Sequence, residues 1–453
     1  MPSIAAHADP APSARGRITV GDVEAMVAAI DAKVSAQLNA ILHHEDFQRL
    51  ESAWRGLKFL VSRTETDELL KVRCLSISRA ELARTLRRYK GTGWDQSPIF
   101  RRIYAEEFGQ FGGHPYGCLL GDYSFDHTAP DLELLGEMAK IGAAAHVPFI
   151  AGASPSVLQM SSWLELPRLH GMAQLLATPE YAAWRSLRET EDARYLGLAL
   201  PRFLARLPYG ARTNPVQGLD FEEDTGGADQ SKYLWCNAAF AMAVNVMRSF
   251  SEYGWACSIR GVDSGGIVKG LIEHRHTTSD GQADTRCTTE VAIGDRREAE
   301  LAKAGFMPLV HIRGSGQAVF IGAQSLQKPA QLTDPDASAN ASLAARLPYI
   351  FATCRFAHYL KCIVRDKIAT FTDRAAMERY LHDWIMGYVD GDPANSSDAV
   401  KAQKPLAAAE VVVEEAPDKP GTYLSKFALR PHYQLEGLTV SLRLLSRLPA
   451  RAR

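Results

Sequence analysis

The sequence has almost no net charge and no long apolar run. Its 51 basic and 52 acidic side chains leave a formal net charge of -1, so no overall positive field attracts nucleic acid or an anionic membrane. No uninterrupted apolar stretch approaches the roughly 18 residues of a membrane-spanning helix. The first eighteen residues are rich in Ala and Pro and lack the apolar core of a signal peptide. We therefore expect no nucleic-acid partner and no membrane insertion.

Cysteine is scarce and is never spaced as Cys-x-x-Cys. An odd, scattered set argues against a disulfide framework and favours a reducing compartment, so we expect a cytoplasmic protein. The glycine-rich stretches GQFGGHPYG and RGSGQ match neither a phosphate-binding loop nor a dinucleotide fingerprint, and we expect no cofactor. The seven cysteines are Cys74, Cys118, Cys236, Cys257, Cys287, Cys354 and Cys362.

What the sequence does have is the composition and periodicity of a globular α/β protein. Its 453 residues are 46% hydrophobic and 23% charged, and a chain of this length exceeds one core, so two or three domains are expected. Strand-like segments at 116–125 and 148–154 flank a predicted helix at 129–147, which is the alternation of an α/β fold. Further strands are predicted at 69–78, 255–261, 289–294, 306–314 and 318–325, and an apolar helix at 234–254.

A polar, proline-broken stretch at 327–342 is the best candidate for a linker. We predict a disordered segment at 1–19, an N-terminal and middle α/β region at 20–330, and a C-terminal domain at 331–453 in which two helices precede a β-rich tail. Near the start of the chain, residues 22–42 carry apolar side chains at helical spacing. This stripe comprises Val23, Met26, Val27, Ile30, Val34, Leu38, Ile41 and Leu42.

The segment RGVDSGGIVKG at 260–270 raises a catalytic hypothesis. Its Asp263-Ser264-Gly265-Gly266 run resembles the loop that presents the nucleophilic serine of trypsin-like proteases, and His146 is a candidate base. However, helices are predicted between His146 and Ser264, whereas such proteases are pairs of β-barrels, and no local signature marks an acid to orient the histidine. Since short motifs produce many false matches, a glycine-rich turn is favoured over a serine hydrolase.

Several histidines and cysteines are candidate metal ligands. Cys354, His358 and Cys362 lie at i, i+4 and i+8 along one face of a predicted helix, but a zinc site takes ligands from separate segments and needs a fourth. Buried thiols and a hydrogen-bonded histidine are the simpler interpretation, and no metal site is predicted. His274 and His276 are interpreted as residues on one face of a strand. His43 and His44 are interpreted as a cap at the end of a helix, where a positive charge is favourable.

A charged run, WRSLRETEDARYLGL at 184–198, is the best candidate for a subunit contact. Arg185 with Glu189 and Arg188 with Asp192 are (i, i+4) pairs. A solvated helix face is the alternative, but arginine among aromatic residues favours a contact. The alternating strands of the C-terminal tail can also donate or accept edge strands. The candidate interface residues are therefore Arg185, Arg188, Glu189, Glu191, Asp192, Arg194, Val411, Val413, Tyr423, Phe427 and Leu429.

Long segments between about residue 20 and residue 447 resemble one family in the same order. They include AIDAKVSAQLNAILHHEDFQRLESAWRGLKFLV, EFGQFGGHPYGCLLGDYSF, YGWACSIRGVDSGGIVKGL, LPYIFATCRFAHYLKCIVRDKIATF and LRPHYQLEGLTVSLRLL. On these segments the chain resembles the large subunit of the type VI secretion contractile sheath, the TssC/VipB family. Such long matches are far more specific than a tripeptide.

The resemblance implies a mixed α/β (α+β), multi-domain contractile tail-sheath-like fold with a β-rich C-terminal tail, and no enzyme activity. It implies pairing with a small sheath subunit (TssB/VipA-like) and helical polymerisation around an inner tube (Hcp-like). Contraction triggered by a baseplate would propel the tube and its effectors into a target cell, and an AAA+ ATPase (ClpV-like) would dismantle the contracted sheath. The segment GVDSGG would be a turn, and the stripe of 22–42 would dock on the small subunit or on the body of the protein.

Two alternatives stay open at this point. One is the sheath protein of a phage-tail-like particle, and the other is a serine hydrolase that uses Ser264 and His146. Members of the family commonly carry a longer amino-terminal segment with a helix that the ATPase engages. Because only about twenty residues precede the shared region here, we expect weakened recycling by that route, or a paralogue that works beside a full-length copy.

Overall fold

The structure divides the chain into two units. One combines Met1–Arg49 with Leu207–Tyr233, and the other combines Leu50–Arg206 with Leu234–Arg453. The boundary predicted at residue 330 is not one of these divisions and stays a prediction. The computed structural model describes residues 19–91, 93–108, 110, 112–225, 230–277, 283–367, 374–415, 423–432 and 442–447, so the disordered segment predicted at 1–19 lies outside the described residues except for Thr19.

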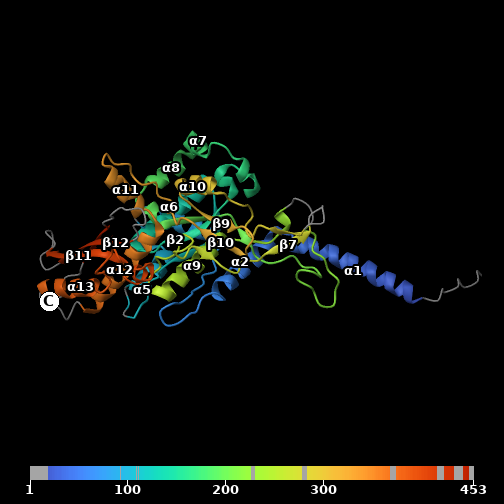
Figure 1. Cartoon of the computed structure of the whole chain (residues 1–453), viewed down its shortest axis with the longest axis horizontal. Coiled ribbons are helices and arrows are strands. Elements are labelled where there is room, and N and C mark those ends of the chain that lie inside the picture. Colours follow the sequence, from blue (N-terminus) through green and yellow to red (C-terminus); the bar gives the residue numbers. More distant parts are fainter. Residues whose placement is uncertain are drawn as a thin grey trace, which may run out of the picture. The chain divides into compact units, whose positions relative to one another are not determined.

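Helix α1 (Val20–Leu42) dominates the first unit (Figure 1). It begins at a capping box, in which Thr19 Oγ1 accepts the backbone N–H of Asp22 at 3.3 Å and the Asp22 carboxylate accepts the Thr19 N–H at 2.8 Å. This reciprocal arrangement satisfies donors that a helix N-terminus leaves free. At the other end of α1, the backbone N–H of Asp224 donates to Asn39 Oδ1 at 2.8 Å, which ties the segment after Leu207 to the helix.

The second unit is built on a mixed sheet, with the described strands in the order β1-β2-β3-β9-β10-β6. Its first four strands run parallel, and β10 and β6 complete it in antiparallel pairing. Every residue of β2 and β3 is buried, as expected of parallel strands covered on both faces. The strands are β1 (Leu119–Phe125), β2 (Phe149–Ala153), β3 (Leu196–Leu200), β9 (Phe306–Ile312), β10 (Gln317–Phe320) and β6 (Ile267–Val268).

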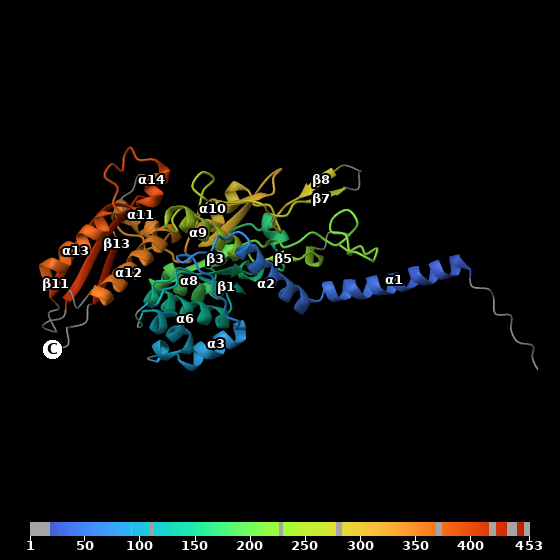
Figure 2. The same ribbon diagram turned by 90° about the horizontal axis from the view of Figure 1, so that it is seen from below.

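Helices α6 (Ala129–Ala145) and α9 (Ala238–Tyr253) cover opposite faces of this sheet (Figure 2). The assignment follows from β2, in which Ala151 packs in the core that contains α6 and its neighbour Ile150 packs in the core that contains α9, because successive strand residues point to opposite faces. Asn237 caps α9 through the backbone N–H of Ala239 at 2.9 Å. The α/β alternation that the sequence predicts is confirmed.

The C-terminal part forms a further layer of helices and an antiparallel sheet, visible in orange and red in Figure 1. Helix α13 packs on β11, where the backbone N–H of Val413 donates to the Glu378 carboxylate at 3.2 Å. This layer has its own core around Trp255, Phe356 and Leu381. Its elements are α11 (Pro335–Ala344), α12 (Leu347–Lys367), α13 (Arg374–Met386), α14 (Asp398–Gln403), β11 (Leu406–Glu415), β12 (Tyr423–Pro431) and β13 (Leu442–Arg447).

Three predicted strands are wrong. Residues 69–78 form no strand in the structure, and 255–261 and 289–294 contribute only isolated bridges, from Arg260 to Gly265 and from Thr289 to Phe203. Alternating polarity alone does not supply a neighbouring strand along which a ladder of backbone hydrogen bonds could extend. The remaining helices and strands are α2 (Glu45–Val61), α3 (Arg79–Arg88), α4 (Pro98–Phe100), α5 (Glu106–Phe108), α7 (Met172–Ala177), α8 (Ala182–Glu189), α10 (Asp295–Lys303), β4 (Phe203–Leu204), β5 (Trp235–Cys236), β7 (His274–Thr277) and β8 (Ala283–Arg286).

Candidate functional site

The Asp263–Gly266 segment is a turn that α9 holds in place. Arg248 Nη1 donates to the carbonyl of Ile267 at 2.9 Å, and Asn245 Nδ2 donates to the carbonyl of Gly266 at 3.0 Å. Gly265 has a φ of 85°, a conformation that favours glycine, and a Cβ there would collide with the carbonyl oxygen of Ser258. The glycines therefore serve the backbone geometry of a turn.

His146, the candidate base, belongs to a different environment. It ends α6 in the left-handed conformation, with a φ of 52°. Burial, and then the positive charges of Lys361, His358 and Arg194, lower the pKa of His146 to about 3. Within the part of the chain that the structure describes, no carboxylate contributes to this shift, so nothing there makes the imidazole a stronger base. Among the described residues, no hydrogen bond joins His146 to Ser264, and the triad geometry of a serine hydrolase is absent.

Cys354, His358 and Cys362, which the sequence analysis weighed and set aside as metal ligands, lie on α12, where Cys354 and His358 are buried and Cys362 is partly buried. Burial raises the pKa values of Cys354 and Cys362, which disfavours the thiolate that binds metal. His358 Nε2 lies 3.0 Å from the carbonyl oxygen of Ala145, which fits the hydrogen-bonded histidine expected from the sequence. The described residues contain no group of three ligands that could hold a metal. The other histidines are dispersed: His43 lies 3.5 Å from Glu223, His44 lies 3.8 Å from Asp46, His274 is buried, and the His276 side chain lies outside the described residues.

The two ion pairs predicted within the charged run are wrong. Helix α8 ends at Glu189, so Arg188 and Asp192 do not share a helix. Arg188 is buried and its Nε donates to the carbonyl of Leu326 at 2.8 Å. Arg185 Nη1 donates to the carbonyls of Leu176 at 2.8 Å and Thr178 at 2.6 Å. These two arginines bind the chain's own backbone instead of an acidic neighbour.

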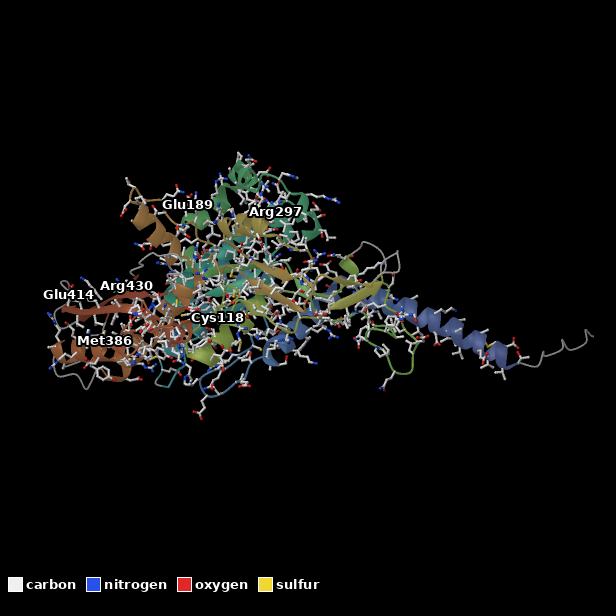
Figure 3. The ribbon with its side chains drawn as sticks, in the orientation of Figure 1. Cys118, Glu189, Arg297, Met386, Glu414 and Arg430 are labelled. Atoms are coloured by element: carbon white, nitrogen blue, oxygen red, sulfur yellow. The ribbon has the colours of Figure 1, made fainter. Side chains whose placement is uncertain are left out.

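The remaining charged candidates stay near the surface. Glu189 (Figure 3) lies 3.7 Å from the Lys328 ammonium, and Glu191 lies 3.6 Å from the Arg194 guanidinium. Burial raises the pKa of Asp192. Exposed pairs at such distances contribute little to stability, so these side chains remain available for a contact. Their role at an interface stays a prediction.

The apolar candidates of the C-terminal sheet point into the core of their own layer. The buried residues are Val411, Val413, Phe427 and Leu429, while the Tyr423 side chain lies outside the described residues. The opposite face carries Glu414 (Figure 3) in an ion pair of 2.5 Å with Lys426. A partner would therefore meet the strand edges or this charged face.

Helix α1 carries the largest exposed apolar surface of the first unit. None of its 23 residues is buried. By length and composition, α1 is the one described helix that is long and apolar enough to cross a membrane. This property alone is weak evidence for a membrane-spanning helix. Asp31 and Lys33 lie in the middle of the helix. In a membrane-spanning helix, placing these two charged side chains near the centre of the bilayer would cost much free energy. The exposed stripe is formed by Val20 (76%), Val23 (49%), Met26 (58%), Val27 (50%), Ile30 (60%), Val34 (41%) and Ile41 (42%).

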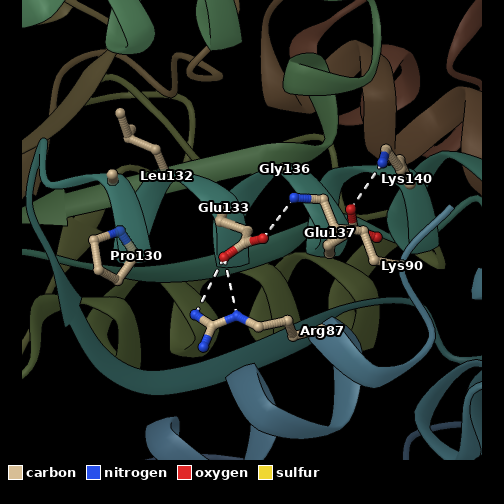
Figure 4. Close-up of a pocket in the computed structure, with 9 residues that line it drawn as sticks. Arg87, Lys90, Pro130, Leu132, Glu133, Gly136, Glu137 and Lys140 are labelled. Atoms are coloured by element: carbon tan, nitrogen blue, oxygen red, sulfur yellow. Dashed lines mark hydrogen bonds and ion pairs between the residues drawn. The ribbon is translucent and has the colours of Figure 1, made fainter.

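A groove of about 530 Å³ lies between the end of α3 and the outer face of α6 (Figure 4). Its cations are Arg87, Lys90 and Lys140. Glu133 lies 3.1 Å from Arg87 Nη2 and 2.6 Å from Lys90 Nζ, and Glu137 lies 2.8 Å from Lys140 Nζ. The hydrogen bond and charge of Lys90 lower the pKa of Glu133. The sequence analysis missed this groove, since its two walls come from separate segments of the chain.

Comparisons with known proteins identify the family. The model of the EvpB/VC_A0108 tail sheath N-terminal domain matches residues 24–327, and that of the EvpB/VC_A0108 tail sheath gpW/gp25-like domain matches residues 336–448. The chain belongs to the VipB tail sheath family. It is 64% identical over 448 residues to the type VI secretion system sheath protein TssC1 of Pseudomonas aeruginosa, a match that covers 99% of this chain and 90% of that relative.

A solved structure also has some likeness to this member of the VipB tail sheath family. It is the six-fold symmetrised baseplate of the anti-feeding prophage, with a TM-score of 0.38 and 10% identity over 85% of this chain and 81% of that one. At this level of similarity the match supports no conclusion about fold or function. The family assignment therefore depends on the two domain models and on the sheath relative.

Proposed function

We propose that this chain is the large structural subunit of a cytoplasmic type VI secretion sheath, which pairs with a small sheath subunit and polymerises helically around an inner tube. Membership of the tail sheath family and the identity with a sheath protein support this role. The observation that carries the pairing is the exposed apolar stripe of α1. A helix that leaves most of its apolar stripe exposed in its own unit favours a partner for that stripe.

The spacing of the α1 stripe indicates what that partner is. Val20, Val27, Val34 and Ile41 recur every seven residues, and Val23 and Ile30 fall three residues after the first two of them. This is the a/d pattern of a coiled coil, in which each apolar knob inserts between four side chains of a facing helix. The occupant of the stripe is therefore a helix, which we assign to the small subunit (TssB/VipA-like).

The C-terminal sheet supplies a second means of joining subunits. Strand β11 is ten residues long and, within the described residues, pairs along its length with β12 alone. On its other edge the Val413 N–H donates to Glu378, and Leu406 is bound by Tyr388 and Asp390. The backbone groups between these positions can pair with a strand from another subunit. A contact in which this edge binds a different strand of another subunit is heterologous, and heterologous contacts that do not close generate helical polymers.

The remaining partners follow from the same role. An inner tube protein (Hcp-like) would lie inside the polymer, a baseplate would trigger contraction, and an AAA+ ATPase (ClpV-like) would disassemble the contracted form. Contraction requires two alternative packings of similar stability at the subunit contacts. The sheath needs no reaction centre, and Ser264 in its α9-held turn takes no part in chemistry.

Co-expression with the small sheath subunit tests this function. We expect the two chains to co-purify and to form hollow helical polymers in negative-stain electron microscopy. The Ser264→Ala variant serves as a control and should assemble like the unchanged chain. If the chain stays alone in the presence of its small subunit, or if Ser264→Ala abolishes a hydrolytic activity, the proposal is wrong.

A further inference from the structure

An acidic loop follows α2 and has no ionic partner among the described residues. Glu65, Asp67 and Glu68 are exposed within four positions. Asp67 Oδ1 accepts the backbone N–H groups of Leu69 and Leu70, each at 2.7 Å, so the turn has a defined shape. Leu69 is 77% exposed at its tip. The loop therefore presents negative charges around one protruding apolar side chain in a preorganised turn.

The α3–α6 groove has the complementary character. Its three cations outnumber its two carboxylates, and the side chains of Arg87, Lys90 and Lys140 keep 57%, 57% and 46% of their surface exposed. A guanidinium offers five N–H donors and an ammonium three, so each cation can hold a further carboxylate beside its present one. Between these charges the walls are formed by Ala129, Pro130, Leu132 and Gly136, which are small or apolar.

The loop and the groove lie on opposite faces of the sheet. Thr64, at the start of the loop, donates its hydroxyl toward Met247 Sδ of α9 at 3.5 Å, and the neighbouring Arg63 Nη2 donates to the carbonyl of Gly270 at 2.6 Å. The groove is built on α6, which covers the other face (Figure 2). The loop of one copy is thus held away from its own groove, and another copy has to supply the acidic side chains.

We propose that the acidic loop at Glu65–Leu69 of one subunit docks into the α3–α6 groove of a second copy of this chain. Glu65 and Glu68 would pair with Arg87, Lys90 and Lys140, and Leu69 would contact the small residues between them. Because the two surfaces differ and lie on opposite faces, each copy has one of each free to bind onward. Such a heterologous contact propagates in one direction, and it builds an open helix when the rotation between copies does not close a ring.

This contact rests on the proposed function, since it operates in the assembled sheath. It would determine which surfaces of neighbouring large subunits meet, in addition to any strand exchange. Charged contacts of this kind mainly set orientation and association rate. They are also screened by salt over about 8–10 Å at physiological ionic strength, so subunit stacking through this contact should weaken as salt is raised.

A charge-swap experiment on the full chain, co-expressed with the small subunit, tests the proposal. One variant carries Arg87→Glu and Lys90→Glu, a second carries Glu65→Lys and Glu68→Lys, and a third combines all four changes. Asp67 stays unchanged because it shapes the turn. We expect each two-residue reversal to raise the protein concentration needed for sheath assembly at least about tenfold, because attractions become repulsions. The combined variant should restore assembly.

Co-purification with the small subunit and thermal unfolding monitor folding in every variant. The matched control is Arg296→Glu, a charge reversal at a side chain that is 94% exposed on α10, and it should assemble normally. Assembly of both two-residue variants at the original concentration would overturn the proposal. So would a groove reversal that blocks assembly while the loop reversal does not, or a combined variant that stays unassembled. If the unchanged chain forms no sheath, the proposed function itself fails.

Discussion

Replacing Ile30 with aspartate should strongly weaken pairing with the small subunit and leave the free chain as stable as before. Ile30 keeps 60% of its surface exposed in the centre of the α1 stripe. Complete burial of an isoleucine is worth about 1.5–3 kcal/mol, so covering the exposed part of Ile30 contributes roughly 1–2 kcal/mol of binding free energy. An aspartate in the same place also loses its hydration without gaining a partner, which adds a few kcal/mol of cost.

The two contributions together amount to about 3–5 kcal/mol, which weakens the pairing about 10²- to 10³-fold or more. Isothermal titration of the small subunit into the Ile30→Asp chain measures this loss. Ala32→Asp is the matched control, because Ala32 is exposed two positions away and lies outside the stripe. Unchanged affinity of Ile30→Asp, or an equal loss in Ala32→Asp, would refute the assignment of α1 to a helical partner.

The interior of the second unit gives three further predictions. Gly56→Ala should destabilise the chain by about 1–3 kcal/mol in thermal unfolding, because a Cβ there would lie 2.6 Å from Phe240 Cδ2; an unchanged melting temperature would contradict this packing. Gly265→Ala should cost at least about 1 kcal/mol through its positive φ, while the adjacent Ser264→Ala should be neutral within about 0.5 kcal/mol. Burial lowers the pKa of His358 from its ordinary value of 6.5 to about 3. As the pH falls, the histidine of the unfolded chain is therefore protonated before that of the folded chain. The free energy of unfolding should then fall by about 1.4 kcal/mol for each pH unit below 6.5. Denaturant titrations of a His358→Gln variant should show a shallower slope, and an identical slope would exclude this histidine as a cause.

The sequence predicted those elements that depend on local signals. Helix α9 is an example, since the long apolar run at 234–254 predicted it, although the structure begins the helix only after Asn237. The strands β1 and β2 around α6 were also predicted, because their apolar runs end at recognisable turns. The same kind of local reasoning failed at 69–78, where alternating polarity was not matched by a neighbouring strand.

The predicted contact residues show a second limit. Val413 and Phe427 are apolar in alternating strands, but the sequence did not reveal that α12 and α13 cover that face of the sheet. Arg188 has an acidic residue four positions on, yet α8 ends one residue after the arginine. Its guanidinium instead reaches the carbonyl of Leu326, 138 positions away. Such partners depend on packing between segments, which sequence spacing does not encode.

Taken by itself, the amino-acid sequence determined the family, through long segments matched in order along the chain. It also determined the α/β alternation and the apolar stripe of α1, which depend on residue order within a short window. Tertiary structure alone decided that this stripe is left largely exposed in its own unit, that the serine of GVDSGG lies apart from His146, and that Arg87 and Lys140 form one groove. The physical reason is that burial and electrostatic pairing depend on distances in space, and these are established only when remote segments pack together.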